Sequence, residues 1–230
     1  VYKRQSIISL NSKVKDLGEV NILEKSYREY KQSDKQINLS EIYWKKLEIT
    51  DNKTTTTNKW LFNYQYAGII AKAIPNAKII HCYRNPLDNI LSTYRAHFAI
   101  GNYFSSSLVD SAEVYSDQDE IMRTYKKEFK NHIYSLNYDK LVTHPSDEIK
   151  SLIHWLGWSW NDLYLSPHLN KRKVSTRSNV QVRSPINTKS LGGWKNYKEM
   201  LKPVMEILTK KEKYKAVSYT HLRAHETVHY

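Results

Sequence analysis

Residues 77–92, Ala-Lys-Ile-Ile-His-Cys-Tyr-Arg-Asn-Pro-Leu-Asp-Asn-Ile-Leu-Ser, decide the fold of this chain. The run that ends at Tyr83 holds β-branched residues and a cysteine, and it predicts a buried strand. Arg84 ends this strand. Asn85 and Pro86 are typical of the N-cap and the first position of a helix. The stretch therefore predicts a strand, a tight turn and a helix, which is the repeating unit of α/β proteins.

The predicted helix carries one apolar face, and Ser92 falls off that face on the side shared with Asp88. The apolar members recur at helical spacing: Leu87, Ile90, Leu91, Tyr94 and Phe98. Arg84 is expected at the carboxyl edge of the sheet, beside the positive end of this helix. Open α/β sheets bind ligands at that edge, and phosphates favour helix N-termini. The sequence therefore predicts an anion site around Arg84.

The rest of the chain alternates between predicted helices and strands. Residues 6–24 are expected to hold a helix end, a turn and a new helix or loop; helices are expected at 26–47, 58–73, 120–129 and 145–155, a strand at 132–138, a strand edge or loop at 51–58, and a loop-rich insert at 101–119. Strands that alternate with helices favour a mostly parallel sheet. The length of 230 residues suggests one domain, or one domain and a fragment.

A long polar stretch lies near the C-terminus at residues 178–196, Ser-Asn-Val-Gln-Val-Arg-Ser-Pro-Ile-Asn-Thr-Lys-Ser-Leu-Gly-Gly-Trp-Lys-Asn. It combines a proline, a Gly-Gly pair, basic side chains and many hydroxyl or amide groups before it reaches Trp194. This composition is typical of a loop that wraps an anion and is held to the core by an aromatic anchor.

Three segments together resemble the sulfotransferase family, most closely its tetratricopeptide-type and tyrosylprotein branches. Residues 84–92 resemble the family's R-D/N-P-x-D-x-x-x-S, residues 138–145 resemble Y-E/D-x-L-V-x-x-P, and residues 178–194 resemble S-x-x-Q-V-x-x-P-I/V-x-x-x-S-x-x-x-W. The resemblance implies a P-loop NTPase-like three-layer α/β sandwich with a mostly parallel central sheet. It also implies an enzyme that moves a sulfuryl group from 3′-phosphoadenosine-5′-phosphosulfate (PAPS) to a hydroxyl or amine acceptor.

The resemblance implies which residues bind PAPS. Arg84 and Ser92 would hold the 3′-phosphate. Tyr138 would lie against the adenine, although a tyrosine packed in the core is an equally good interpretation of that residue alone. The C-terminal loop would close over the donor with five residues: Gln181, Arg183, Ser190, Trp194 and Lys195. The family often has a basic residue directly before the loop tryptophan, where this chain has Gly193, so Arg183, Lys189 or Lys195 would supply the charge.

The resemblance also implies three catalytic residues. Sulfuryl transfer needs a group that accepts a proton from the acceptor and a positive charge at the bridging oxygen. Gly18-Glu19 resembles the family's G-E, whose glutamate is the proposed base in the tyrosylprotein branch. Asn58-Lys59 resembles the family's N/D-K, whose lysine contacts the sulfate and the bridging oxygen, and Ser178 matches the serine at the sulfate. Taken alone, Glu19 and Lys59 would be ordinary surface charges.

Composition leaves two other functions open. The chain has 36 Lys and Arg against 23 Asp and Glu, a net charge of +13, which attracts polyanions of many kinds. A nucleotide or nucleoside kinase of the P-loop fold is one alternative, and a noncatalytic basic module that binds polyanions is the other. The basic residues are scattered and form no RNA-recognition signature, so nucleic acid is not expected as a partner.

Other patterns bound the cofactors and partners. The nine histidines form no metal-type cluster with cysteines or carboxylates, so no metal is expected. No apolar run approaches about 18 residues, so no membrane span is expected. The acceptor is a small molecule, a peptide or a carbohydrate, and a homodimer stays open. The compartment is unknown, and the cytoplasm is favoured if the source is bacterial.

Both ends of the chain look foreign. Residues 1–5 and 217–230 resemble translations of a sequencing adapter, so the native domain is expected to run from residue 6 to residue 216. The family's P-loop-like 5′-phosphosulfate loop should precede Ser6, and this chain lacks it. That loop supplies backbone N–H groups to the phosphosulfate, so the chain is expected to be a fragment with no activity as it stands.

Overall fold

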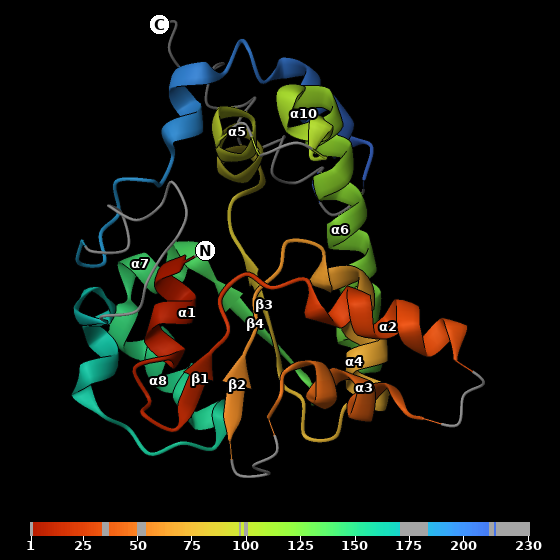
Figure 1. Cartoon of the computed structure of the whole chain (residues 1–230). Helices are drawn as coiled ribbons and strands as arrows, with labels where there is room; N and C mark the ends of the chain where they lie inside the picture. Colours follow the sequence, from red (N-terminus) through yellow and green to blue (C-terminus); the bar gives the residue numbers. More distant parts are fainter. Residues whose placement is uncertain are drawn as a thin grey trace, which may run out of the picture. The chain divides into compact units, whose positions relative to one another are not determined.

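The computed structural model of the chain describes residues 2–33, 37–49, 54–96, 98, 101–170, 184–211 and 214 (Figure 1). The chain divides into two compact units. The first consists of Val1–Tyr83 and Ile121–Thr188, and the second of Arg84–Glu120 and Lys189–Tyr230. Each unit has a hydrophobic core of its own among the described residues.

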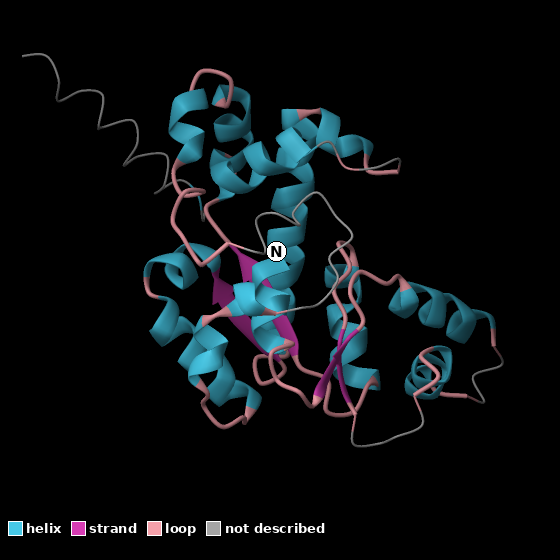
Figure 2. Ribbon diagram, turned by 60° about the vertical axis from the view of Figure 1, so that its left-hand side comes forward, coloured by secondary structure: helices cyan, strands magenta, loops and turns pink. Residues whose placement is uncertain are grey.

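All described strands belong to the first unit, and they pair in parallel. They are β1 (Val14–Asp16), β2 (Thr55–Thr57), β3 (Ile79–Tyr83) and β4 (Ile133–Asn137). Strand β1 pairs with β2, and β3 pairs with β4 in a register that places Ile79 opposite Ile133 (Figure 2). Parallel pairing requires crossover connections, which the helices between the strands supply. The predicted α/β class with parallel strands is confirmed, and the described strands form two two-stranded sheets.

Helices make up most of the first unit. They are α1 (Tyr2–Ile8), α2 (Ile22–Gln32), α3 (Leu39–Lys46), η1 (Asn63–Tyr66), α4 (Ala67–Ala73), α7 (Tyr138–Thr143), α8 (Pro145–Leu156), η3 (Asp162–Leu165), η4 (Pro167–Leu169) and the C-terminal part of α6 (Leu108–Glu128). Among the described residues of this unit, the largest buried cluster joins α1, β4, α7 and α8 through side chains such as Ile7, Leu136 and Leu152. Close packing also fixes α4 against α6, because a Cβ at Gly68 would lie 2.6 Å from the Tyr125 ring.

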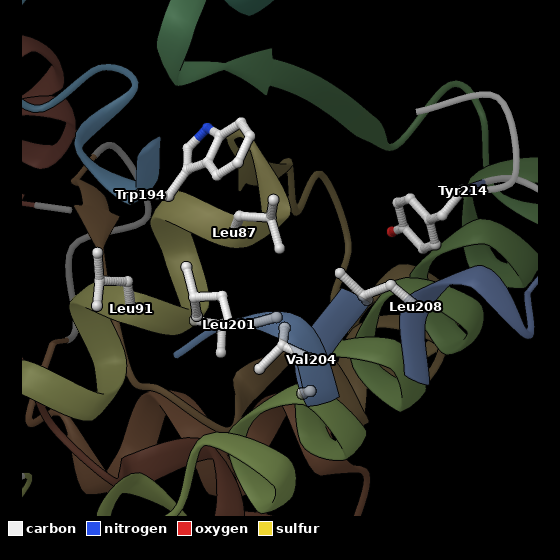
Figure 3. Packing of buried hydrophobic residues seen from close by; sticks show 9 residues of the cluster. Leu87, Leu91, Trp194, Leu201, Val204, Leu208 and Tyr214 are labelled. Carbon is white, nitrogen blue, oxygen red and sulfur yellow. The ribbon is translucent and has the colours of Figure 1, made fainter. Parts of the chain in front are cut away.

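The second unit is built from α5 (Pro86–Ala96), η2 (Tyr103–Ser106), the first part of α6, η5 (Gly193–Tyr197) and α10 (Lys202–Thr209). Its core gathers residues from both chain segments of the unit: Leu87, Ile90, Leu91, Ala112, Trp194, Leu201, Val204, Leu208 and Tyr214 (Figure 3). The apolar face of α5 therefore packs against residues more than 100 positions later in the chain.

Several predicted elements are confirmed. Strand β3 and helix α5 lie where residues 77–92 place them, and the Asn85 side chain caps α5 by accepting hydrogen bonds from the backbone N–H groups of Leu87 and Asp88. The predicted helix at 145–155 is α8, which ends at Gly157 in the left-handed conformation with φ of 78°. The predicted strand at 132–138 is β4, and the helical prediction for 26–47 matches α2 and α3.

Three predictions are wrong, and one strand was not predicted. Residues 101–119 are no loop-rich insert, because α6 begins at Leu108. Nine of the 21 residues of this helix are charged and few of its side chains are buried, so its apolar period is weak. Residues 58–62 open no helix: the Lys59 N–H continues the ladder of β1 and β2, and the helical turns begin at Asn63. Phe98 follows the end of α5 and is 39% exposed, so it is not part of the apolar face. Strand β1 was not expected, since three residues carry too little pattern.

The predicted boundaries of the native domain, residues 6–216, stay a prediction. Residues Tyr2 to Gln5 form part of α1, and the buried Gln5 side chain donates a hydrogen bond of 2.7 Å to Asp16. The C-terminal segment 217–230 lies outside the described residues.

Candidate functional site

The predicted catalytic residues Glu19 and Lys59 follow the ends of the paired strands β1 and β2. The ladder continues past both strands, because the Leu17 N–H donates to the Thr57 carbonyl at 2.9 Å and the Lys59 N–H donates to the Gly18 carbonyl at 3.0 Å. Gly18 has a φ of 69°, a left-handed conformation that glycine adopts without steric cost. The backbone turns at Gly18 and places Glu19 beside Lys59.

The two side chains form an ion pair. The Lys59 ammonium donates a hydrogen bond to Glu19 Oε1, and each side chain is 25% exposed. A carboxylate is a proton acceptor, and an ammonium is a compact positive charge with three donors. A base and a cation thus lie in direct contact, reachable from solvent, at the carboxyl ends of two parallel strands, where α/β proteins bind ligands.

A pocket of about 520 Å³ opens beside this pair. Its lining residues follow β1 and β2 or lie on the neighbouring helices α2 and α3: Glu19, Val20, Asn21, Ile22, Lys25, Lys46 and Trp60. Its volume is in the range of small-molecule sites. The pocket can therefore hold an acceptor group, with Glu19 among its lining residues.

The predicted anion residues of the second unit lie on and around α5. Arg84 follows β3 directly, and its guanidinium donates to the Ser190 carbonyl at 3.5 Å. The Tyr115 hydroxyl donates to the Arg84 carbonyl at 3.4 Å and ties α6 to this backbone. Ser92 is exposed on α5, as predicted from its place off the apolar face. Arg84 and Ser190 are thereby brought together, while Ser92 stays open to solvent.

The described part of the C-terminal loop, from Ser184 on, is anchored as its composition predicts. Trp194 is 3% exposed and packs in the core of the second unit beside Leu87 (Figure 3). Lys195 is exposed. A contact by Trp194 with the donor stays a prediction, since its indole is buried among apolar side chains. Ser178, Gln181 and Arg183 lie outside the described residues.

Tyr138 begins α7 directly after β4. Its side chain is half-buried and packs against the cluster that contains Leu136 and Leu141. The adenine contact predicted for Tyr138 stays a prediction beside the alternative that it is a packing residue.

Sequence reasoning missed one residue of this region, Asp88. It lies in the first turn of α5, is only 3% exposed and binds the backbone of the C-terminal loop. The sequence placed it on the side of Ser92, yet Ser92 is exposed and Asp88 is covered. One feature of the sequence could have indicated its burial: Asp88 follows Leu87 in a helix whose inner face is otherwise apolar.

In the part of the chain that the structure describes, no three His, Cys, Asp or Glu side chains gather as metal ligands would. Within the same ranges, no helix has the length and apolar character needed to cross a bilayer.

Comparison with known proteins shows the family. The model of the sulfotransferase family matches residues 11–162, about two thirds of the chain. This match includes both strand pairs, Glu19, Lys59, Arg84 and Ser92. The chain belongs to the sulfotransferase family.

The chain is also similar to individual curated proteins. An uncharacterized protein of Aquifex aeolicus is 36% identical over 149 residues, which are 64% of this chain and 20% of that protein. Protein-tyrosine sulfotransferase 1 of Danio rerio is 28% identical over 145 residues, 60% of this chain and 41% of that protein. The chain thus spans between one fifth and about two fifths of the length of these curated relatives.

Two solved structures share the fold. The sulfotransferase domain from the curacin biosynthetic pathway has a TM-score of 0.51 at 14% identity, over 82% of this chain and 77% of that domain. The sulfotransferase domain from the Synechococcus PCC 7002 olefin synthase has a TM-score of 0.56 at 17% identity, over 75% of this chain and 62% of that domain. The predicted P-loop-like α/β fold of sulfotransferases is thereby confirmed.

Proposed function

We propose that the domain to which this chain belongs transfers a sulfuryl group from PAPS to a hydroxyl or amine acceptor, once the 5′-phosphosulfate loop expected before Ser6 is present. The observation that carries the proposal is the contact between Glu19 and Lys59 at the ends of β1 and β2, beside a pocket of about 520 Å³. A paired base and cation supply the two groups that the reaction needs.

In the proposed reaction the acceptor oxygen attacks the sulfur in line with the bond to the leaving phosphate. A new sulfur–oxygen bond forms, the bond to the bridging oxygen breaks, and adenosine 3′,5′-bisphosphate leaves. Glu19 takes the proton of the acceptor hydroxyl and becomes neutral. Lys59 then loses the charge of its partner at the moment when negative charge builds on the bridging oxygen, so its ammonium is free to stabilise that oxygen.

Other residues would bind the donor. Arg84 and Ser92 bind the 3′-phosphate, since a guanidinium forms two parallel hydrogen bonds to phosphate. Tyr138 stacks on the adenine. The C-terminal loop contributes Gln181, Arg183, Ser190, Trp194 and Lys195, and Ser178 contacts the sulfate. No metal takes part in this proposal.

The relatives suggest which class of acceptor to assay first. Because the Danio rerio relative is a protein-tyrosine sulfotransferase, a peptide tyrosine is the first acceptor to assay. Sugar hydroxyls and small alcohols or amines are assayed beside it, because the pocket volume admits each of them.

Replacement of Glu19 tests the function. Glu19→Gln keeps the shape of the side chain but removes the proton acceptor, so turnover with PAPS should fall by about 100-fold or more while the donor KM changes little. Glu128→Gln is the matched control, because Glu128 forms a surface ion pair with Lys72 at 3.2 Å. Turnover is measured with ³⁵S-labelled PAPS over a panel of acceptors, in a chain extended by the 5′-phosphosulfate loop expected before Ser6.

Three results would refute the proposal. Equal turnover of Glu19→Gln and Glu128→Gln would remove Glu19 as the base. Phosphoryl transfer from ATP in place of sulfuryl transfer from PAPS would favour a kinase. Binding of heparin or nucleic acid with no preference for PAPS over ATP would favour a polyanion-binding module.

A further inference from the structure

The buried carboxylate of Asp88 holds the C-terminal loop on helix α5. Asp88 Oδ2 accepts a hydrogen bond of 2.7 Å from the Gly192 N–H, and Oδ1 accepts one of 3.0 Å from the Trp194 N–H. The residue is 3% exposed. Burial of a carboxylate is costly unless hydrogen bonds satisfy it, and here the main chain of a single loop provides two of them.

The loop is shaped for this contact. Gly192 has a φ of 68°, a left-handed conformation that favours glycine, and it turns the chain so that two nearby N–H groups reach the same carboxylate. A Cβ at Gly193 would lie 3.7 Å from Asp88 Oδ1, so the backbone also passes close to the carboxylate. The Trp194 side chain is buried in the core formed with Leu87 and Leu91 (Figure 3).

These hydrogen bonds also decide which groups of the loop remain for a ligand. The N–H groups of Gly192 and Trp194 are already bound to Asp88. A phosphate at this place therefore cannot be held by these two N–H groups. Basic side chains lie on both sides of the contact: Arg84, four residues before Asp88, and Lys195, directly after Trp194.

The contact sets the spacing between these side chains. Arg84 already reaches the loop at the Ser190 carbonyl. The Lys195 side chain runs back along Gly192, with its Cε 3.6 Å from the position that a Cβ there would take. Ser92 lies one helical turn after Asp88 on α5. The Asp88 carboxylate thus joins the segment that carries Arg84 and Ser92 to the segment that carries Lys195.

We propose that Asp88 is a positioning residue, which fixes the loop from Ser190 to Lys195 against α5 and so arranges Arg84, Ser92 and Lys195 around one phosphate. The identity of that phosphate as the 3′-phosphate of the donor rests on the proposed function. Asp88 itself touches no ligand.

The Asp88→Asn variant tests the proposal. An asparagine can accept only one of the two loop N–H groups, and its NH₂ opposes the other, so the loop loses its fixed place. The probes are adenosine 3′,5′-bisphosphate and adenosine 5′-phosphate, which lacks the 3′-phosphate, with binding measured by calorimetry. We expect the dissociation constant of the bisphosphate to rise at least about tenfold, while that of the monophosphate changes less than about twofold.

Controls separate positioning from folding. Asp110→Asn makes the same change at an exposed position in the first turn of α6, and it should leave both dissociation constants unchanged. If Asp88→Asn does not fold, Gly192→Ala strains the same loop with Asp88 intact and should cause the same selective loss. Equal weakening of both nucleotides would show a merely structural role and overturn the proposal.

Other outcomes are equally decisive. Tighter binding of the bisphosphate by Asp88→Asn would show that the carboxylate acts by repelling the phosphate, which contradicts positioning. Wild-type protein that prefers the bisphosphate, together with an unchanged preference in Asp88→Asn, would overturn the role of Asp88 and leave the proposed function standing. Wild-type protein without any preference would overturn both.

Discussion

The charged side chains of Glu19, Lys59 and Asp88 differ in their burial and in the groups that bind them. Glu19 and Lys59 lie 40 positions apart, yet they form one ion pair in which each side chain is a quarter exposed. An ion pair of this exposure adds about 1 kcal/mol or less to stability. Its value lies in the placement of a base next to a cation. Asp88, by contrast, is buried and bound entirely by backbone groups in the interactions described above.

Arg84 is the residue whose replacement should most affect donor binding. Arg84→Ala removes a bidentate phosphate contact, and we expect affinity for adenosine 3′,5′-bisphosphate to fall at least about tenfold. Arg84→Lys should restore only part of it, because an ammonium lacks the planar fork of the guanidinium. Calorimetric titration measures both variants.

Arg28→Ala serves as the control for Arg84. Its side chain is 73% exposed and pairs with Glu24 within α2, so nucleotide affinity should not change. Wild-type affinity in both Arg84 variants would rule out the assignment of Arg84 to the phosphate.

At the scale of the elements, the junction between β1 and β2 positions the catalytic pair. The Gly18 carbonyl accepts the Lys59 N–H, and the left-handed turn at Gly18 directs Glu19 toward Lys59. The β2 end gains further support from Tyr43 of α3, whose hydroxyl interacts with the side chains of Asn58 and Thr56. Element geometry, more than side-chain chemistry, decides where the base lies.

A pair of glycine variants should separate stability from function. Gly18 and Gly157 both have φ near 70–80°, and a Cβ at either would meet nothing within 4 Å. Each Gly→Ala change should therefore cost about 1 kcal/mol in the free energy of unfolding, from backbone strain alone. Only Gly18→Ala should also lower turnover, since Gly157 merely ends α8.

Denaturant unfolding and turnover assays measure the two effects. If Gly157→Ala lowered turnover as much as Gly18→Ala at equal loss of stability, the junction would have no special role in positioning Glu19.

At the scale of the whole molecule, the chain consists of two units with separate cores, and buried tyrosines take part in both. Burial raises the pKa of Tyr43 and of Tyr164 in the first unit, and it raises the pKa of Tyr214 in the second. For Tyr43, hydrogen bonds with Asn58 and Thr56 offset part of this rise. Such phenols stay protonated in the folded protein at a pH where the unfolded chain has begun to ionise.

The protein should therefore lose stability in alkaline solution. The pKa values of these tyrosines in the folded protein lie above the unfolded value of about 10. Their contribution to the free energy of unfolding is therefore complete below pH 10 and is lost as the pH rises further. Each phenol that stays protonated in the folded protein but ionises in the unfolded chain lowers the free energy of unfolding by up to about 1.4 kcal/mol per pH unit. Tyr43→Phe should flatten the decline by up to that amount.

Urea unfolding between pH 8 and pH 11 measures the slope. Tyr103→Phe is the control, because Tyr103 is 75% exposed and should leave the decline unchanged. A Tyr43→Phe variant with the wild-type slope would show that the Tyr43 hydroxyl ionises equally in the folded and unfolded chains.

The sequence by itself determined the local units and the family. Strand β3, the cap at Asn85, helix α5 and the end of α8 at Gly157 were all predicted, because each depends on residues that are neighbours in the chain. The family motifs likewise identified Arg84, Glu19 and Lys59 as candidates. Only the C-terminal part of helix α6 was predicted, at 120–129; its first part was missed because a helix rich in charged residues has only a weak apolar period.

Only the tertiary structure decided which of these candidates meet. The pairing of β1 with β2 brings Glu19 to Lys59, and the burial of Asp88 follows from a loop more than 100 residues later in the sequence. The residue pattern of a short strand does not predict which strand it pairs with. A single aspartate likewise does not indicate whether a loop will bury it. Such contacts form only when distant segments pack together, because the free energy that selects them comes from the burial and hydrogen bonding of the assembled core.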